Sequence, residues 1–445
     1  METAGPSGDL SLERQPSAAA ADGLPIRLDS AQRTRLLGYA GGLMLLAAFA
    51  APSGNLIGIP VIFFLKNKLH LNAPSLAIFN ALVSLPLYFG FVFGLLRDRW
   101  SPFGLGDRGH FILFGLSAMA AYAIIAQIPP TYALLLIGLI VVTCFSQVVF
   151  GAANGIFSSM GQRHLMPGQA STVLNVVGFA TVVAASLLGG VFSNALEGRG
   201  VEMAAKELFL VGSGLMAALA LLAVLGPRSL YTAHASRPTS RIFEDLVRLP
   251  RHKAIWAPFL LLLLWNFAPG LATALQYHLA DQLHATDAQV GAFYAIFWGC
   301  ELLTALLYGW VCQRVRLSRL LFWGTVVAIP QMIPLLFAHS AQGALMAAVP
   351  VGLMGGFVSA AYLDLAIRSC PAGLQGTMMM LVTSSAYFIA LRAGDVWGAN
   401  IYQNRGGFTA VLWVTTAVYA LQLPVLLLAP RALTATRDGE TLAAP

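Results

Sequence analysis

The residues of this chain that could do chemistry are a few ionisable side chains inside long apolar stretches. Glu301 lies about midway along the stretch 288–310, and Arg392 and Asp395 lie within the stretch 374–402. Ionisable groups are costly inside a bilayer and usually face a partner or a water-filled cavity. Because desolvation favours the neutral form of a carboxyl group, the sequence predicts Glu301 as a proton-coupling site. A carboxyl that only packs two helices by a hydrogen bond is the alternative.

Arg392 and Asp395 are three residues apart and therefore share one face of a helix. One interpretation is an internal ion pair that neutralises itself. The other is functional: Arg392 attracts an anionic group of a cargo molecule, and Asp395, the second candidate for proton coupling, releases Arg392 when the cargo arrives. The sequence leaves both interpretations open.

Neutral polar residues in the apolar stretches are further candidates for cargo contact. A Pro269-Gly270 break in the stretch 257–280 could turn the residues that follow it toward a cavity, where one or two of them could stack on a flat heterocycle. Taken singly, each candidate is also explained as a contact between helices. The candidates are Gln276, Tyr277, His278, Gln147 and Asn55.

A second group of charges lies where apolar stretches end. The run 94–99 (GLLRDR) contains Asp98, whose carboxylate could cap a neighbouring helix or pair with an arginine. Asp364 and Arg368 are four residues apart near the end of a later stretch. For the first loop, solvated charges that only orient the protein are the alternative. We predict a conformational gate that does not contact cargo, formed by Asp98, Arg99, Arg108, Asp364 and Arg368.

The elements that must position these residues are apolar segments of about twenty residues, enough to cross a bilayer core as a helix. The chain is 58% hydrophobic and only 10% charged, with a mean hydropathy of +0.73. Membrane orientation explains the formal charge of +7 better than nucleic-acid binding does. We expect an all-α integral membrane protein in a lipid bilayer, with twelve transmembrane helices at 36–65, 75–97, 110–127, 132–156, 171–193, 207–226, 257–280, 288–310, 319–338, 342–366, 374–402 and 407–429.

The distribution of positive charge predicts that both termini are cytoplasmic, because cytoplasmic loops collect Lys and Arg. Most of the 26 Lys and Arg residues lie in the tails, in the central loop and in loops on the same side of the predicted membrane. The loops on the other side hold Lys66, Lys68, Arg199, Lys206 and Arg405. We expect a bacterial inner-membrane protein whose first 34 residues are a disordered tail.

The two halves of the chain resemble each other. The run 65–70 (LKNKLH) recurs as 279–284 (LADQLH), and the run 94–99 (GLLRDR) recurs as 309–314 (GWVCQR). Interrupted helices at corresponding positions of two halves indicate a transporter's binding site. The predicted divisions are a tail at 1–34, a six-helix bundle at 35–226, a cytoplasmic linker at 227–256, a second six-helix bundle at 257–430 and a tail at 431–445.

This layout resembles the major facilitator superfamily, whose signature loop reads Gly-x-x-x-Asp-Arg followed by basic residues, as the run 94–99 and Arg108 do. The resemblance implies two pseudo-symmetric bundles that rock about a central cavity, a small-molecule cargo and a functional monomer.

A narrower resemblance is to the folate–biopterin transporter family. It is carried by the run 64–69 (FLKNKL), by Leu85-Pro86, by Asp98 with the following 102–104 (PFG), and by 266–270 (NFAPG). This resemblance implies a folate- or pterin-like cargo. The chain departs from the family pattern at Gly109, where a second arginine is expected, and at Gln313, where the second half is expected to have an acidic residue.

Motifs of other functional classes are missing from the sequence. It has no Gly-rich ATP-binding loop and no spaced metal ligands. We therefore expect no enzyme activity, no metal and no cofactor, and transport that draws on a gradient, with protons as the coupling ion. Two alternatives stay open. One is efflux or uptake of drugs or muropeptides on the same fold. The other is a non-transporting protein that delivers a pigment or cofactor during assembly of a membrane complex.

Overall fold

The computed structural model describes residues 28–71, 73–231 and 250–440, and this part of the chain is helical and contains no strands. The predicted tail 1–34 and linker 227–256 lie mostly outside the described residues.

The first half contains α1 (Ser30–Ala50), α2 (Asn55–Asn67), α3 (Ala73–Val83), α4 (Leu85–Tyr88), α5 (Gly90–Arg99), η2 (Pro102–Gly104), α6 (Asp107–Ile125), α7 (Tyr132–Arg163), α8 (Pro167–Glu197) and α9 (Val201–Leu225). The second half contains η5 (Lys253–Ile255), α11 (Trp256–Asn266), α12 (Thr273–Tyr277), η6 (His278–Gln282), α13 (Asp287–Val311), α14 (Leu317–Ala328), η7 (Ile333–Phe337), α15 (Ala341–Ser369), α16 (Gln375–Met380), η8 (Leu381–Ser385), α17 (Ala386–Asn404), α18 (Gly407–Ala420), α19 (Gln422–Leu426) and α20 (Arg431–Thr434). The short η3 (Arg228–Leu230) follows the first half.

Eight helical segments of the described residues are long and apolar enough to cross a membrane, and shorter apolar helices accompany them. The predicted all-α membrane fold is therefore confirmed. Several predicted spans are broken into shorter helices rather than continuous. Breaks follow α1 at Pro52, α11 at Pro269 and α14 at Pro330, because proline lacks the N–H group that a helix needs and clashes with the preceding turn.

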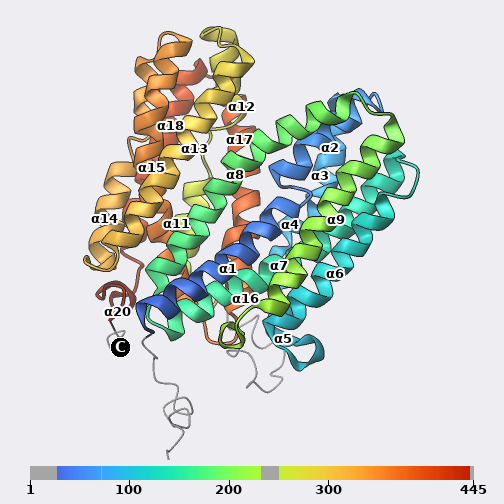
Figure 1. The fold of residues 1–445 in the computed structure, drawn as a ribbon. Coiled ribbons are helices and arrows are strands. Elements are labelled where there is room, and N and C mark those ends of the chain that lie inside the picture. The colour runs from blue at the N-terminus through green and yellow to red at the C-terminus, as the bar shows by residue number, and fades with distance from the viewer. Residues whose placement is uncertain (1–27, 72, 232–249, 441–445) are drawn as a thin grey trace, which may run out of the picture.

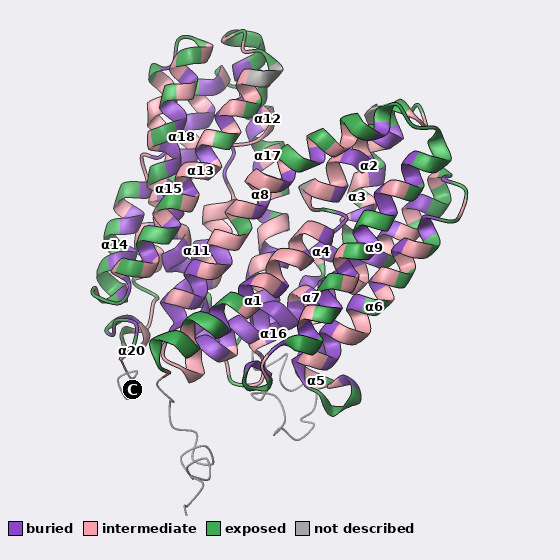
Figure 2. Cartoon of the chain, in the orientation of Figure 1, coloured by how far each residue is buried: buried purple, intermediate pink, exposed green. Residues whose placement is uncertain are grey.

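The hydrophobic core differs between the two ends of the molecule. One cluster of buried residues joins both halves near the start of α1 and near α20, and it includes Phe157 of the first half and Tyr362 of the second. Farther along, the cores are separate, with Tyr122 in one and Phe293 in the other. The two bundles pack together at the first end, which we call the closed end, and diverge at the other, the open end (Figures 1 and 2).

The predicted repeat of the two halves reappears in the backbone at the open end. His70 and His284 both adopt a left-handed conformation, with φ of 51° and 50°. Each follows a helix whose end is closed by the same bond, from Leu71 N to Leu65 O in one half and from Ala285 N to Leu279 O in the other. Both bonds span six residues and close the helix end around a left-handed histidine, so the runs 65–70 and 279–284 are equivalent in structure as well as in sequence.

Candidate functional site

A cavity of about 350 Å³ lies between the two halves. Its walls come from α1, α7 and α8 of the first half and from α11, α13, α15, η8, α17 and α18 of the second. The volume is within the range that small-molecule sites occupy in proteins. A site shared by both halves would change shape if the halves moved relative to each other.

The lining of the cavity carries one carboxylic acid and no base. Among its residues Glu301 is the only Asp or Glu, and none is Lys, Arg or His. An acid isolated in this way has no lining cation to balance it, and a buried group of this kind tends to neutralise by binding a proton.

Glu301 is held between α13 and α15, with 4% of its surface exposed. Nε2 of Gln331 lies 3.5 Å from Glu301 Oε1, and it also donates to the carbonyl of Val351 at 2.9 Å. A Cβ atom at Gly355 would overlap Oε1 of Glu301. Glycine at this position therefore allows α15 to lie directly against the carboxyl group.

Aromatic rings form much of the remaining wall. Trp265 stacks on Tyr419, with ring centroids 5.0 Å apart and an angle of 23° between the planes. Phe179 of α8 meets Trp298 of α13 with centroids 5.7 Å apart, so one aromatic contact crosses between the halves. A cavity with these walls suits a flat or apolar cargo.

Asn154, a residue of the cavity wall, has an unpaired hydrogen-bond acceptor. Its Nδ2 donates to the carbonyl of Phe150 at 3.0 Å, whereas its buried Oδ1 has no hydrogen-bond partner in the described part of the chain. Nearby, Ser359 donates to Oδ1 of Asn175 at 2.9 Å and joins α15 to α8. Buried polar atoms are normally paired, so Oδ1 of Asn154 is the lining atom most in need of a ligand or water.

Three of the predicted cargo residues lie on the broken helix near the open end and do not line the cavity. Gln276 and Tyr277 are exposed on α12. His278, in η6, stacks on Phe408 with centroids 4.0 Å apart and shares a 2.6 Å hydrogen bond with Gln282. The segment after the break at Pro269 therefore forms no part of the cavity wall in this conformation.

The other predicted cargo residues also lie outside the cavity lining. Gln147 is buried and accepts a hydrogen bond from Ser384 at 3.1 Å, so it joins the two halves. Arg392 is exposed on α17, and no ion pair with Asp395 is present. Asp395 instead accepts from the backbone N–H of Thr273 at 2.9 Å and caps the start of α12. The side chain of Asn55 lies outside the described part of the structure.

At the closed end, Asp98 of α5 caps a helix of the opposite half. Its carboxylate accepts from the N–H groups of Gly376 and Thr377 at 3.0 and 2.7 Å, and from the Thr377 hydroxyl at 2.7 Å. Unpaired N–H groups and the helix dipole favour a carboxylate at the start of α16. Asp98 thus makes the kind of contact that the sequence suggested.

Arg97 holds this carboxylate in place, and sequence reasoning did not single it out. Its side chain is fully buried and donates to Asp107 at 2.5 and 2.6 Å and to Asp98 at 2.8 Å. A Cβ atom at Gly155 would overlap the guanidinium group. The only sequence signal is the position of Arg97 in the loop motif, where positive charge is expected for orientation alone.

The hydrogen bonds of Arg108 and the ion pair between Asp364 and Arg368 each stay within one half. Arg108 donates to the carbonyl of Ala223 at 3.1 Å and to that of Val224, so it caps the end of α9 and does not reach the second half. Asp364 and Arg368 form a buried pair at 2.7 Å on α15. Arg99, at the end of α5, is half-buried.

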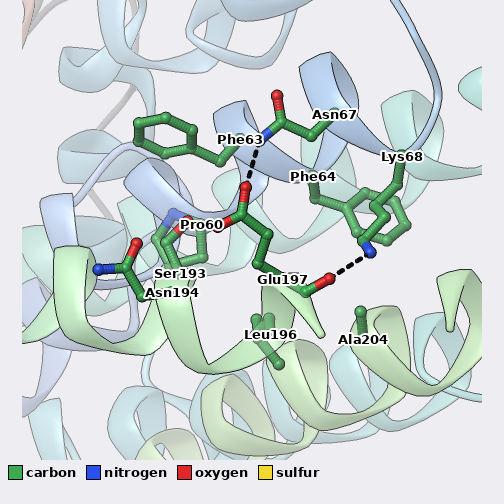
Figure 3. Close-up of a pocket in the computed structure, with 10 residues that line it drawn as sticks. All are labelled: Pro60, Phe63, Phe64, Asn67, Lys68, Ser193, Asn194, Leu196, Glu197 and Ala204. Carbon is green, nitrogen blue, oxygen red and sulfur yellow. Dashed lines mark hydrogen bonds between the residues drawn. The ribbon is translucent and has the colours of Figure 1, made fainter. Parts of the chain in front are cut away.

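The open end of the first half is fastened by different contacts. Lys68 donates to the carbonyls of Glu197 and Arg199 at 2.7 and 2.9 Å, and the first of these bonds is drawn in Figure 3. Asn67 reaches the Glu197 carboxylate at 3.5 Å. These bonds satisfy carbonyls at the end of α8 and tie it to α2. The pocket beside them, of about 60 Å³, is far smaller than the cavity between the halves.

The fold and the cavity define a helical membrane protein with a site between two similar bundles. Residues 31–393 match the family model described as Major Facilitator Superfamily. The chain belongs to that superfamily, and it is a transporter rather than an enzyme. No curated protein sequence matches the chain closely enough to give a relative.

Solved structures share this fold at low sequence identity. The human organic anion transporter MFSD10 (TETRAN) is 16% identical with a TM-score of 0.60, over 90% of this chain and 100% of that one. A variant of the E. coli fucose:proton symporter FucP is 16% identical with a TM-score of 0.65, over 88% of this chain and 98% of that one. FucP in the outward conformation is 15% identical with a TM-score of 0.62, over 88% of this chain and 98% of that one. None of these comparisons supports the narrower resemblance to the folate–biopterin transporter family.

Proposed function

We propose that this protein is a proton-coupled secondary transporter that works by alternating access, with Glu301 as its proton site. The observation that carries the proposal is the single carboxylic acid in a cavity that both halves line and that contains no lining base. A group of this kind can be neutral when the cavity faces a more acidic side and charged when it faces the other.

The two ends of the molecule support alternating access. One core joins the halves at the closed end, whereas the cores are separate toward the open end. With both termini in the cytoplasm of a bacterial inner membrane, as the charge distribution predicts, this is an outward-facing conformation. Asp98 and its bonds to α16 then hold the cytoplasmic side shut.

The leading cargo is a flat, uncharged heterocycle of the pterin type. Trp265, Tyr419, Phe179 and Trp298 offer ring faces for stacking, and Oδ1 of Asn154 offers an acceptor. A free pterin ring needs no cationic partner. The carboxylates of folate would need one, and no lining residue supplies it, so within this class the cavity favours pterin over folate.

Export of an apolar organic cation in exchange for protons is the second candidate. Aromatic walls with one buried acid are suited to a cation, which would bind to ionised Glu301 and to the ring faces. The same lining disfavours an organic anion, which is the cargo named for MFSD10. A proton as coupling ion is also named for the fucose:proton symporter FucP.

Delivery of a pigment or cofactor is the least supported alternative. It predicts a cavity that is filled by side chains or opens sideways to lipid. The cavity instead lies between the halves and is lined by Glu301 and Asn154 as well as by apolar groups, which favours a small cargo.

Uptake into proteoliposomes distinguishes these functions. Labelled biopterin, folate and ethidium are tested with the interior more alkaline and then more acidic than the medium. A pterin symporter accumulates biopterin only with the alkaline interior. A cation antiporter accumulates ethidium only with the acidic interior. Glu301→Gln should abolish the dependence on the gradient, whereas the control Glu202→Gln, at an exposed site on α9, should not. Accumulation of none of the three by folded protein would contradict the proposed cargo classes.

A further inference from the structure

The segment that follows the last transmembrane helix is folded against the closed end. Thr434, the last residue of α20, is buried, and so are Thr436 and Asp438 after it. Arg368 of α15 donates to the carbonyl and hydroxyl of Thr436 at 3.2 and 3.0 Å. The N–H group of Asp438 donates to the carbonyl of Cys312 at 3.0 Å. This part of the predicted cytoplasmic tail is thus attached to the second half as an ordered element.

From this position the tail reaches the first half. The Asp438 carboxylate accepts from the N–H groups of Gly168 and Gln169, at the start of α8, at 2.9 and 3.2 Å. Nε2 of Gln169 adds a third bond at 3.1 Å. The N–H group of Gly439 donates to the carbonyl of Leu165 at 2.7 Å. Because α8 belongs to the first half and the tail is fixed to the second, these bonds cross the interface that must separate when the closed end opens.

The contact has the same geometry as the one that Asp98 makes with α16. In both, one carboxylate oxygen accepts from the N–H of a glycine, Gly376 or Gly168, and the other accepts from the next N–H and from that residue's side chain. Both glycines are also sterically required. A Cβ atom at Gly376 would lie 2.9 Å from Asp98 Oδ1, and one at Gly168 would lie 3.0 Å from Asp364 Oδ2.

In the second half, the run 309–314, which is equivalent to 94–99, has no acidic residue that could make the same contact. Gln313 stands where the repeat places the equivalent of Asp98, but it is exposed and donates to the carbonyl of Gly309 in its own helix. We propose that Asp438 supplies the missing carboxylate, so that the C-terminal segment 436–440 is a working part of the gate and stabilises the conformation with the closed end shut.

The charged groups that act on Asp438 lie on α15, and its contacts with α8 are neutral. Burial and then the Asp364 carboxylate raise the pKa of Asp438 from 3.8 to about 6, against the opposing effects of the α8 hydrogen bonds and Arg368. The attached tail therefore binds a proton more tightly than a free tail. Attachment of the tail through Asp438 is therefore most favourable below pH 3.8, and it weakens as the pH rises through about 6. The facing charged and titratable groups are Asp364 and Arg368 of α15 and Cys312 after α13, and α8 adds the neutral amide of Gln169.

Two native cysteines report on this gate without added probes. Cys312 is buried, and its Sγ lies 3.9 Å from Asp438 Oδ2. Cys370 is buried beside α16, and its carbonyl accepts from Gln162 of the first half at 2.8 Å. Loosening of the tail alone would expose Cys312, whereas opening of the whole closed end would expose both.

The experiment measures labelling by a membrane-impermeant maleimide of the full-length protein in nanodiscs, with each cysteine followed by peptide mapping. Asp438→Ala should raise the labelling rates of both Cys312 and Cys370 roughly tenfold to hundredfold. Asp98→Ala should do the same, and the exposed Gln313→Ala should change neither. If Asp438→Ala exposes Cys312 alone, or neither cysteine, the tail is not part of the gate and the inference is wrong.

A milder variant keeps the test decisive if Asp438→Ala does not fold. Gln169→Ala removes only the side-chain bond to Asp438 and should raise both rates about threefold. Unchanged rates would overturn the inference in that case.

The inference rests on the proposed alternating-access function. The labelling uses no cargo and no proton gradient, so it can fail while transport stands, and transport of the proposed cargoes can fail while the gate contact stands.

Discussion

Replacement of Arg97 by glutamine tests whether the buried charge cluster at the closed end stabilises the fold. The guanidinium donates hydrogen bonds to both Asp98 and Asp107, and the three side chains are at most 2% exposed. Its removal leaves two buried carboxylates without their cation, and breaking a buried ion pair in this way costs about 3–5 kcal/mol. We expect Arg97→Gln to lower the free energy of unfolding by that amount.

The assay is unfolding of purified protein in mixed micelles with increasing SDS, followed by circular dichroism. Arg314→Gln is the matched control, because that guanidinium is exposed, covers the ring of Trp310 at 3.8 Å and donates one hydrogen bond to the Trp310 carbonyl, at 2.8 Å. Its loss should cost less than about 1 kcal/mol. Arg97→Gln combined with Asp107→Asn should cost less than the sum of the two single changes. Equal losses for the two arginine variants, or simple additivity in the double variant, would refute the reasoning.

Three further predictions concern the cavity and the gate. Asn154→Ala should weaken cargo binding roughly threefold to tenfold, measured as Kd with labelled cargo, and an unchanged Kd would remove Oδ1 from the site. Gly94→Ala would place a Cβ atom on the carbonyl of Gly376, so it should separate α5 from α16 and speed labelling of Cys370; no change would contradict the close packing there. The ratio of Cys312 labelling in Asp438→Ala to that in the unchanged protein should fall as pH rises from 5 to 8, and a constant or rising ratio would contradict the raised pKa of Asp438.

The fold could be predicted from the sequence because a bilayer allows few solutions. Long uncharged segments must be helices that satisfy their own backbone, and the paired runs 65–70 and 279–284 indicated two similar halves. The broken helices were harder to predict. Pro52 and Pro269 were visible, but whether a proline bends a helix or ends it depends on the neighbours that satisfy the freed backbone groups.

The candidate site could be predicted only in part. Glu301 stood out because a carboxyl group midway along an apolar span is rare, and the structure places it in the cavity wall. Tyr277 and Arg392 lie outside the cavity, because helical spacing says which residues share a face but not which face turns inward. The helices are apolar all round, so no polar face marks the cavity side. Trp265 was hidden among many other aromatic residues, and Asp438 lay in a tail with no recognisable motif.

The most direct test of the proposed mechanism separates exchange from proton-driven accumulation in proteoliposomes. Once a cargo is known, the Glu301→Gln protein is compared with the unchanged protein in counterflow, which needs no net proton movement, and in accumulation driven by a pH gradient. The account predicts that the variant retains counterflow but no longer accumulates cargo, and that cargo no longer drives proton movement. Gradient-driven accumulation that survives in Glu301→Gln would contradict the role of Glu301 as the proton site.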